Sequence, residues 1–214
     1  MHYTINNLLS LKNEIEKNNN NKSNIIAVSK TFSAERIIPL IEYGHKHFGE
    51  NKVQEAVEKW SDLKEKFGDI KLHLVGKLQT NKVKFVLKLF DYIHSVDSIK
   101  LATKISNEQK KYKKKPKIFI QVNIGNESQK SGINKNELKN FYNSCIKLDL
   151  DVIGTMCLPP DDGKSDLYFS EMKKLNDGIN LKEISMGMSA DYLSAIKNGA
   201  SFVRIGSKIF GPRS

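Results

Sequence analysis

The chain has 214 residues, 39% of them hydrophobic, and a formal net charge of +11. At about 150 residues per domain, this length allows one full-sized domain or two small ones. No apolar run approaches the roughly 18 residues of a membrane helix, and residues 1–3 show no basic start of a signal peptide. Cys145 and Cys157 are isolated and lack the spacing of metal ligands. We therefore expect a cytoplasmic protein with reduced thiols, no metal site and no membrane segment.

Lysine supplies most of the positive charge, with 35 Lys and Arg residues against 24 Asp and Glu. Such an excess permits binding to nucleic acids or other anions. The lysines are scattered over what we predict to be helix faces, and their densest cluster, at residues 110–115, is interpreted as a solvated helix end and loop. We do not expect nucleic acid to bind.

The first half of the chain predicts alternating helices and strands. Leu8, Leu11 and Ile15 have helical spacing, and the asparagine run at residues 18–21 should end that helix. Residues 25–28 are all apolar and run straight into Ser29, a pattern typical of a strand buried on both faces in a parallel sheet. Further strands are predicted at residues 47–49, 71–75 and 92–96, with helices at 37–41, 53–60 and 83–90.

The second half continues the alternation. Strands are predicted at residues 117–124, at 151–156, in a short segment ending at Ile184, and at 202–206. Helices are predicted near residues 98–105, 138–142, 168–175 and 193–196, and loops at 125–132 and 185–189.

About eight strands, each followed by a helix or a short terminal segment, favour a single (β/α)8 barrel of the TIM type. It should span residues 1–214 as one domain and carry an extra N-terminal helix. The length is near the lower limit for this fold, and a doubly wound open sheet is the main competitor. The number of units favours the barrel, as does the absence of a Gly-x-Gly-x-x-Gly sequence after the first strand.

Lys30 is the first candidate site residue. It ends the predicted strand at residues 25–29, and ligands of barrel proteins bind where the strands end. A half-buried ammonium is costly, so we expect desolvation to lower the pKa of Lys30 toward a reactive amine suited to Schiff-base chemistry. The alternative is a lysine that simply leaves the strand for solvent.

Two small-residue segments follow the seventh and eighth predicted strands, where barrels commonly hold phosphate. The first is residues 185–189 and contains Ser185, Met188 and Ser189; the second is Gly206-Ser207. Glycine lets backbone N–H groups approach an anion closely. The alternative is that the glycines only make tight turns. Because both segments occur after the strands where phosphate is expected, we favour a phosphate site.

Arg204 lies inside an apolar strand and needs an acceptor for its guanidinium. A pyridine nitrogen would be such an acceptor, and the arginine would keep it unprotonated. An ion pair with a carboxylate in the barrel wall is the alternative. His73 could be a satisfied core histidine, and Asn51 could cap a helix or contact a ligand.

The chain resembles the pyridoxal phosphate homeostasis protein family, which has the fold of the alanine racemase N-terminal barrel. The matching segments are residues 27–31 (AVSKT), 48–51 (FGEN), 73–76 (HLVG), 78–82 (LQTNK), 130–132 (KSG), 185–191 (SMGMSAD) and 204–211 (RIGSKIFG). Leu72 and Lys77 depart from the expected pattern, in which a tryptophan precedes the histidine and a small residue or proline precedes the leucine.

The resemblance implies a protein of fold type III that binds pyridoxal 5′-phosphate and lacks the C-terminal β domain of the racemases. Lys30 would form the internal aldimine, and Arg204 would contact the pyridine nitrogen. The phosphate cradle would comprise Ser185, Ser189, Gly206 and Ser207. Asn51, His73 and Met188 complete the expected cofactor-binding set.

The resemblance leaves two functions open. The first is a monomeric carrier that buffers the free aldehyde and delivers it to apo-enzymes, with no catalytic residues. The second is an amino-acid racemase or a similar enzyme, which would need an acid/base group on each face of the cofactor. The printed sequence ends eight residues after Gly206, where the racemases continue into the domain that supplies the second base. We therefore expect the carrier.

Overall fold

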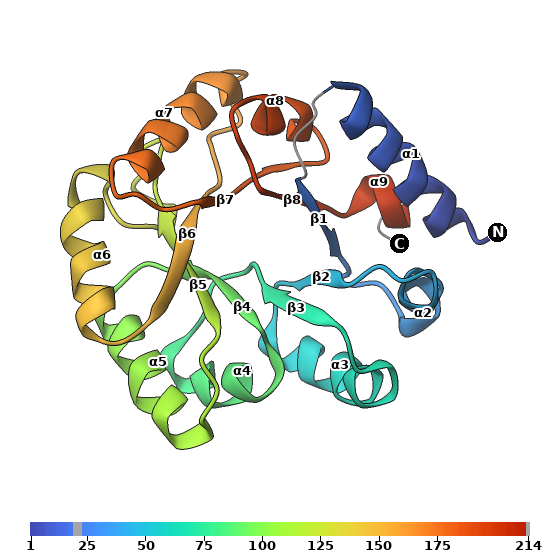
Figure 1. Ribbon diagram of the computed structural model, residues 1–214, viewed down its shortest axis with the longest axis horizontal. Coiled ribbons are helices and arrows are strands. Elements are labelled where there is room, and N and C mark those ends of the chain that lie inside the picture. Colours follow the sequence, from blue (N-terminus) through green and yellow to red (C-terminus); the bar gives the residue numbers. More distant parts are fainter. Residues whose placement is uncertain (19–22, 213–214) are drawn as a thin grey trace.

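A computed structural model describes residues 1–18 and 23–212 of the chain. Its strands form a closed parallel barrel in sequence order, in which the last strand pairs with the first (Figure 1). The strands are β1 (Asn24–Val28), β2 (His47–Glu50), β3 (Lys71–Leu74), β4 (Tyr92–Val96), β5 (Lys117–Val122), β6 (Asp151–Cys157), β7 (Glu183–Met188) and β8 (Phe202–Ile205). The predicted (β/α)8 barrel is confirmed.

Helices form a ring around the barrel (Figure 1). They are α1 (Tyr3–Asn18), α2 (Ala34–Glu42), α3 (Val53–Phe67), α4 (Val83–Leu89), α5 (Ile99–Tyr112), α6 (Leu138–Lys147), α7 (Ser165–Asp177), α8 (Tyr192–Lys197) and α9 (Ser207–Phe210). Two short 3-10 helices, η1 (Thr80–Lys82) and η2 (Lys135–Glu137), precede α4 and α6. Within the described ranges, no helix is both long and apolar enough to cross a membrane.

Helix α1 is the extra element before the first strand. It buries Leu8, Leu11 and Ile15, which confirms the predicted helical stripe. The helix extends through Asn18, and the break predicted from the asparagine run falls on residues 19–21, outside the described residues.

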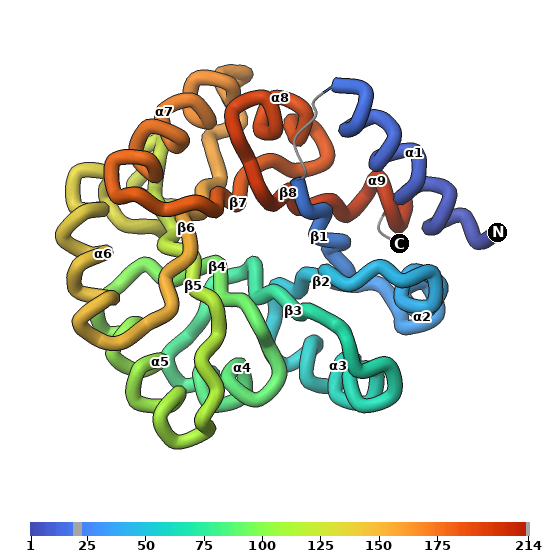
Figure 2. The backbone as a smooth tube through the Cα atoms, viewed as in Figure 1, coloured from blue at the N-terminus to red at the C-terminus, as the bar shows by residue number. Residues whose placement is uncertain are grey.

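The helix α9, which follows the last strand, is held against α1. The Tyr3 hydroxyl donates to the Phe210 carbonyl at 3.2 Å, and Asn7 Nδ2 donates to the Ile209 carbonyl at 3.0 Å. Figure 2 shows the two helices side by side, α1 in blue and α9 in red. The first residues of the chain therefore fix the turn that contains Ser207.

Two apolar layers explain why the strands are buried on both faces. Between barrel and helices lies the large outer core. Inside the barrel lies a smaller cluster of Ile26, Val28, Tyr92, Phe119, Met156 and Phe202. Side chains of this kind fill barrel interiors, so the barrel is a packed core that opens into a site only at its mouth.

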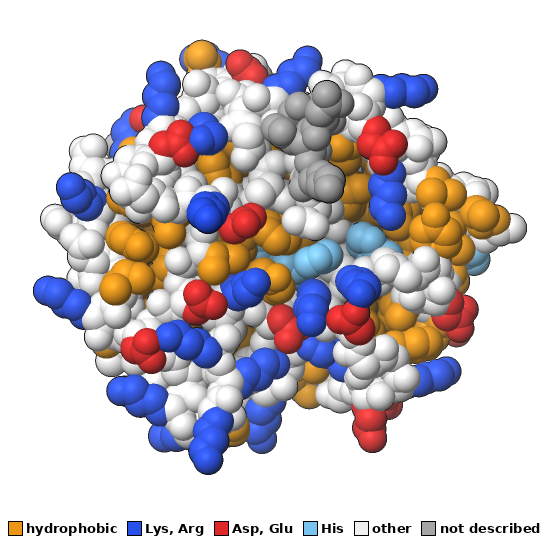
Figure 3. All heavy atoms as spheres, viewed as in Figure 1, with side chains coloured by type: hydrophobic (Ala, Val, Ile, Leu, Met, Phe, Trp, Pro, Cys, Tyr) orange, Lys and Arg blue, Asp and Glu red, His pale blue; other side chains and the backbone are white. Residues whose placement is uncertain are grey.

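Charged side chains are distributed over the face seen in Figure 3, with acidic residues among the lysines and arginines. The dense lysine cluster lies where α5 ends and the following loop begins, as predicted. Lys115 there pairs with Asp149 at 2.6 Å, and Lys114 with Asp91 at 3.7 Å. Cys145 and Cys157 are buried free thiols.

Gly154 marks a place where two strands approach too closely for any side chain. It pairs with Glu183 across β6 and β7, and a Cβ atom added to it would lie 2.0 Å from the Glu183 carbonyl oxygen. We predict that Gly154→Ala lowers the free energy of unfolding by about 2 kcal/mol or more, because the backbone must move to relieve the overlap. Urea unfolding followed by circular dichroism measures this change.

Gly178 provides the matched control. Its φ of −61° suits alanine, and an added Cβ would meet its nearest neighbours at 3.4 Å. Gly178→Ala should therefore change stability by less than about 0.5 kcal/mol. Equal losses in both variants would show that the strands do not meet as described.

Candidate functional site

The residues on either side of Lys30 are anchored to the barrel. The Ser29 hydroxyl donates to Glu50 Oε1 at 2.8 Å, and the Thr31 N–H donates to Glu55 Oε1 at 2.6 Å. Thr31 has a left-handed φ of 68°, a conformation that these contacts hold in place. The half-buried Lys30 side chain therefore extends from a fixed backbone just beyond the end of β1.

Glu50 is the centre of the buried polar cluster that makes this anchor. Its Oε1 also accepts from Lys59 Nζ at 3.0 Å and from Trp60 Nε1 at 2.9 Å. Lys59 additionally donates to the Ser29 carbonyl at 2.9 Å and to Glu55 Oε1 at 3.0 Å. Burial raises the pKa of Glu50, while the Lys59 charge acts in the opposite direction. Helix α3 thus holds the loop that carries the candidate lysine.

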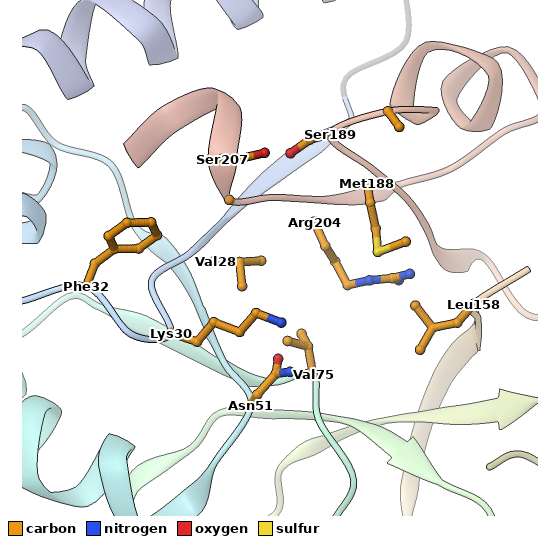
Figure 4. A pocket seen from close by; sticks show the side chains of 12 residues that line it. Val28, Lys30, Phe32, Asn51, Val75, Leu158, Met188, Ser189, Arg204 and Ser207 are labelled. Atoms are coloured by element: carbon orange, nitrogen blue, oxygen red, sulfur yellow. The ribbon is translucent and has the colours of Figure 1, made fainter. Parts of the chain in front are cut away.

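A cavity of about 380 Å³ opens at the mouth where the strands end. Lys30 extends into it from one side and Arg204 from another (Figure 4). Its lining comprises Val28, Lys30, Phe32, Asn51, Val75, Leu158, Met188, Ser189, Ala190, Arg204, Gly206 and Ser207. The structure therefore brings together seven of the predicted site residues: Lys30, Asn51, Met188, Ser189, Arg204, Gly206 and Ser207.

Ser189 and Ser207 form one end of the cavity. Their hydroxyl groups point toward each other across its rim, one from the turn after β7 and the other from the start of α9 (Figure 4). The first backbone N–H groups of a helix lack intrahelical acceptors, so donors as well as hydroxyls are available at such a turn. This end of the cavity suits an anion with several oxygen atoms.

The segment at residues 185–189 is mostly strand, and the prediction of a loop there is wrong. Strand β7 runs through Met188, so only Met188 and Ser189 reach the cavity. Gly187 has a φ of +87°, and an added Cβ would lie 2.5 Å from Ala195 Cβ. Backbone conformation and packing therefore account for this glycine.

Arg204 lies on β8 and is 5% exposed. Its Nη1 donates to Ser185 Oγ at 2.7 Å, and its Nη2 donates to the Cys157 carbonyl at 2.9 Å. Burial lowers the pKa of the guanidinium. Within the described part of the chain, no carboxylate forms an ion pair with it, so the barrel-wall ion pair considered above is not observed.

His73 and Ser185 lie below the cavity and not in its wall. His73 Nε2 lies 2.9 Å from His47 Nδ1, and His73 Nδ1 lies 2.9 Å from His94 Nε2. His94 Nδ1 in turn lies 2.9 Å from Ser185 Oγ. The predicted direct contacts of His73 and Ser185 with a cofactor are therefore corrected, because both residues are fully buried and their polar atoms are engaged within the barrel. We call His47, His73 and His94 the histidine column.

Asn51 contributes to the cavity and does not cap a helix, since Lys52 occupies the N-cap position of α3. Four apolar lining residues were not predicted as part of the site: Val28, Phe32, Val75 and Leu158. His94 was not predicted to take part in a polar network either. The alternation of inward and outward side chains along residues 92–96 could have pointed to it.

Comparison with known proteins covers almost the whole chain. The family described as "Alanine racemase, N-terminal domain" matches residues 5–214. A pyridoxal phosphate homeostasis protein of Aquifex aeolicus (strain VF5) is 36% identical over 203 residues, which cover 90% of this chain and 88% of that protein.

Two solved structures show the same barrel. PipY of Synechococcus elongatus PCC7942, solved with PLP bound, has 31% sequence identity and a TM-score of 0.87, and the match covers 97% of this chain and 100% of that one. Alanine racemase of Clostridium difficile 630 has 18% identity and a TM-score of 0.75, covering 98% of this chain but 56% of the racemase. The second likeness concerns the fold alone.

The buried cluster below Lys30 makes a prediction for Glu50→Gln. The amide removes the buried one of the two carboxylate charges that pair with Lys59, so we expect the free energy of unfolding to fall by about 3 kcal/mol. Urea unfolding of the protein without added ligand measures the loss. Glu58→Gln, at an exposed position of α3, should change the free energy of unfolding by less than about 0.5 kcal/mol. A loss below 1 kcal/mol for Glu50→Gln would contradict the role of the cluster.

The buried histidines predict loss of stability in acid. Burial lowers the pKa of His45 from 6.5 to about 4, and it places the pKa values of His73 and His94 well below 6.5. The unfolded chain therefore takes up protons first as pH falls below about 6.5, and stability present above that pH is lost. From pH 6 to pH 5, His45 alone should cost about 1 kcal/mol.

Urea unfolding at pH 7.5, 6 and 5 measures this loss. His45→Phe should be about 1 kcal/mol less sensitive than the original chain over the step from pH 6 to pH 5. A free energy of unfolding that stays constant across this range would show that these histidines are not held neutral.

Proposed function

This chain belongs to the pyridoxal phosphate homeostasis protein family, and we propose that it holds pyridoxal 5′-phosphate on Lys30 and makes the aldehyde available to other enzymes. The observation that carries the proposal is the cavity, in which Lys30, Arg204 and the two facing serines meet (Figure 4). Bound there, pyridoxal 5′-phosphate supplies an aldehyde that reacts with a primary amine, a pyridine nitrogen and a phosphate group.

Lys30 provides the amine. Its backbone is fixed by Ser29 and Thr31, and its side chain extends into a largely apolar cavity walled by Val28, Phe32 and Val75. The cavity thus presents a primary amine, the group that forms an imine with an aldehyde.

Ser189, Ser207 and the backbone around Gly206 provide the phosphate site. The hydroxyl groups of both serines face the same space, and Gly206 lines it without a side chain. A phosphate accepts hydrogen bonds through several oxygen atoms, so donors from two turns can hold it together.

Arg204 provides the partner for the pyridine nitrogen. Its observed acceptors, Ser185 Oγ and the Cys157 carbonyl, are both neutral, and no carboxylate of the described residues forms an ion pair with it. A guanidinium can only donate hydrogen bonds, and beside the ring it would keep the nitrogen unprotonated. The ring would then be a weak electron sink, a property that suits racemisation as well as storage.

The ionisable groups of the cavity favour a carrier over a racemase. Among its described lining residues, only Lys30 and Arg204 are ionisable side chains. Two-base racemisation requires a second acid or base opposite the lysine, and none of these lining residues supplies it. We accordingly propose delivery to apo-enzymes, and we propose a single-domain cytoplasmic monomer; the buried free thiols are in keeping with a reducing compartment.

A borohydride experiment tests this function. Purified protein incubated with pyridoxal 5′-phosphate and then reduced should carry one pyridoxyl group on Lys30, located by peptide mass mapping. Lys30→Ala should abolish the visible absorbance of the bound cofactor, whereas Lys77→Ala, an exposed lysine outside the cavity, should keep it.

Two results would contradict the proposal. A chain that binds no added pyridoxal 5′-phosphate, or one modified on another lysine, would remove Lys30 from its assigned role. Sustained racemisation or decarboxylation of single amino acids would establish an enzyme in place of a carrier.

A further inference from the structure

The histidine column is an unusual component of a barrel interior, which is normally filled by branched apolar residues. It runs from His47, at the start of β2, through His73 on β3 and His94 on β4, to Ser185 on β7 and so to Arg204 on β8. Every link in this series is between 2.7 and 2.9 Å long. A buried polar series of this length persists only when each member has a partner.

Aromatic rings enclose the column and fix the planes of its imidazoles. His73 stacks on Tyr92 with ring centroids 4.1 Å apart, and His94 stacks on Phe119 at 4.2 Å. Phe202 lies 5.6 Å from His73. His73 and His94 are fully buried, whereas His47 is partly exposed at the opposite end of the barrel from the cavity. Histidine side chains are visible near the centre of the face drawn in Figure 3.

The guanidinium decides the direction of the hydrogen bonds. Arg204 can only donate, so Ser185 Oγ must accept from it. Among the described contacts, the serine proton then has one acceptor, which is His94 Nδ1. His94 must carry its own proton on Nε2 and donate to His73 Nδ1, and His73 must donate from Nε2 to His47 Nδ1.

The reverse direction would leave a buried donor without an acceptor. If His94 donated from Nδ1, Ser185 Oγ would accept from both Arg204 and His94, and its hydroxyl proton would have no acceptor among the described contacts. An unsatisfied buried donor costs about 1–3 kcal/mol. The column is also neutral, because burial lowers the pKa values of His73 and His94 and the Arg204 charge lowers that of His94 further.

We propose that the histidine column is a directional hydrogen-bonded support that orients Ser185 and, through it, positions Arg204 toward the ligand. His94 and His73 are thus positioning residues, and Ser185 is the link between the column and the guanidinium. This inference rests on the proposed function only where it concerns the effect on pyridoxal 5′-phosphate. The direction of the column is a property of the chain itself.

Nitrogen-15 NMR of histidine-labelled protein without ligand tests the direction. At pH 7, His73 and His94 should both be neutral with the proton on Nε2, as two-bond nitrogen–proton correlations report. In Ser185→Ala, His94 Nδ1 loses its hydrogen-bond donor, so its nitrogen-15 shift should change. The proton should stay on Nε2, because a proton on Nδ1 would have no acceptor among the described contacts. Nδ1 protonation or an imidazolium at either position in the original chain would overturn the proposal.

Ligand binding tests the positioning role. His94→Phe keeps the ring stacked on Phe119 but removes the support of Ser185, and we expect the Kd for pyridoxal 5′-phosphate to rise about tenfold or more, with a shifted absorbance maximum. Ser185→Ala should show the same two changes and serves as the second variant if His94→Phe folds poorly. His45→Phe is the control and should leave both quantities unchanged, because His45 is buried nearby and its ring bonds to the backbone carbonyl of His47 and not to an imidazole of the column.

The outcomes separate this inference from the function. Suppose that the borohydride experiment places the pyridoxyl group on Lys30, but that His94→Phe and Ser185→Ala both keep the original Kd and absorbance maximum. The positioning role would then be refuted, and the proposed carrier function would stand. If no form of the chain bound pyridoxal 5′-phosphate, the function would fail, and the NMR measurement would still decide the direction of the column.

Discussion

The pairing of β8 with β1 is the constraint on which the site depends. Ile26 lies opposite Arg204 in this pair, and Ala27 lies opposite Ile205. The chain therefore closes on itself with the strand that leads into Lys30 beside the strand that carries Arg204 and leads into Ser207. Parallel strands end at the same edge, so closure brings an amine, a guanidinium and a hydroxyl from distant parts of the sequence to one mouth.

Two buried polar networks support this mouth from below. One joins α3 to the residues that flank Lys30 through Glu50, and the other joins Arg204 to the opposite end of the barrel through the histidine column. Burying polar groups costs free energy unless they are paired, and apolar side chains of similar volume often give equal or greater stability. One network ends at the residues that flank Lys30 and the other at Arg204, and both Lys30 and Arg204 line the cavity, so the two networks maintain its geometry.

The sequence was sufficient to predict the barrel and to select candidate site residues near the ends of its strands. Alternating apolar runs and helical stripes predicted the fold. Position made Lys30, Arg204 and Ser207 candidates, and the resemblance to a family implied their roles. Ser185 was misplaced because β7 extends further than its short apolar run suggests, and the side chains of a strand alternate between faces, so its first serine points into the barrel. The histidine column could not be predicted, since its contacts join β2, β3, β4 and β7 across the closed interior.

The most direct test of the account is a crystal structure of the protein grown with pyridoxal 5′-phosphate. We predict electron density continuous with Lys30 Nζ, a phosphate between Ser189 and Ser207, and a pyridine nitrogen within hydrogen-bond distance of Arg204. Density for the ligand elsewhere on the chain, or in this cavity with the phosphate directed away from both serines, would contradict it.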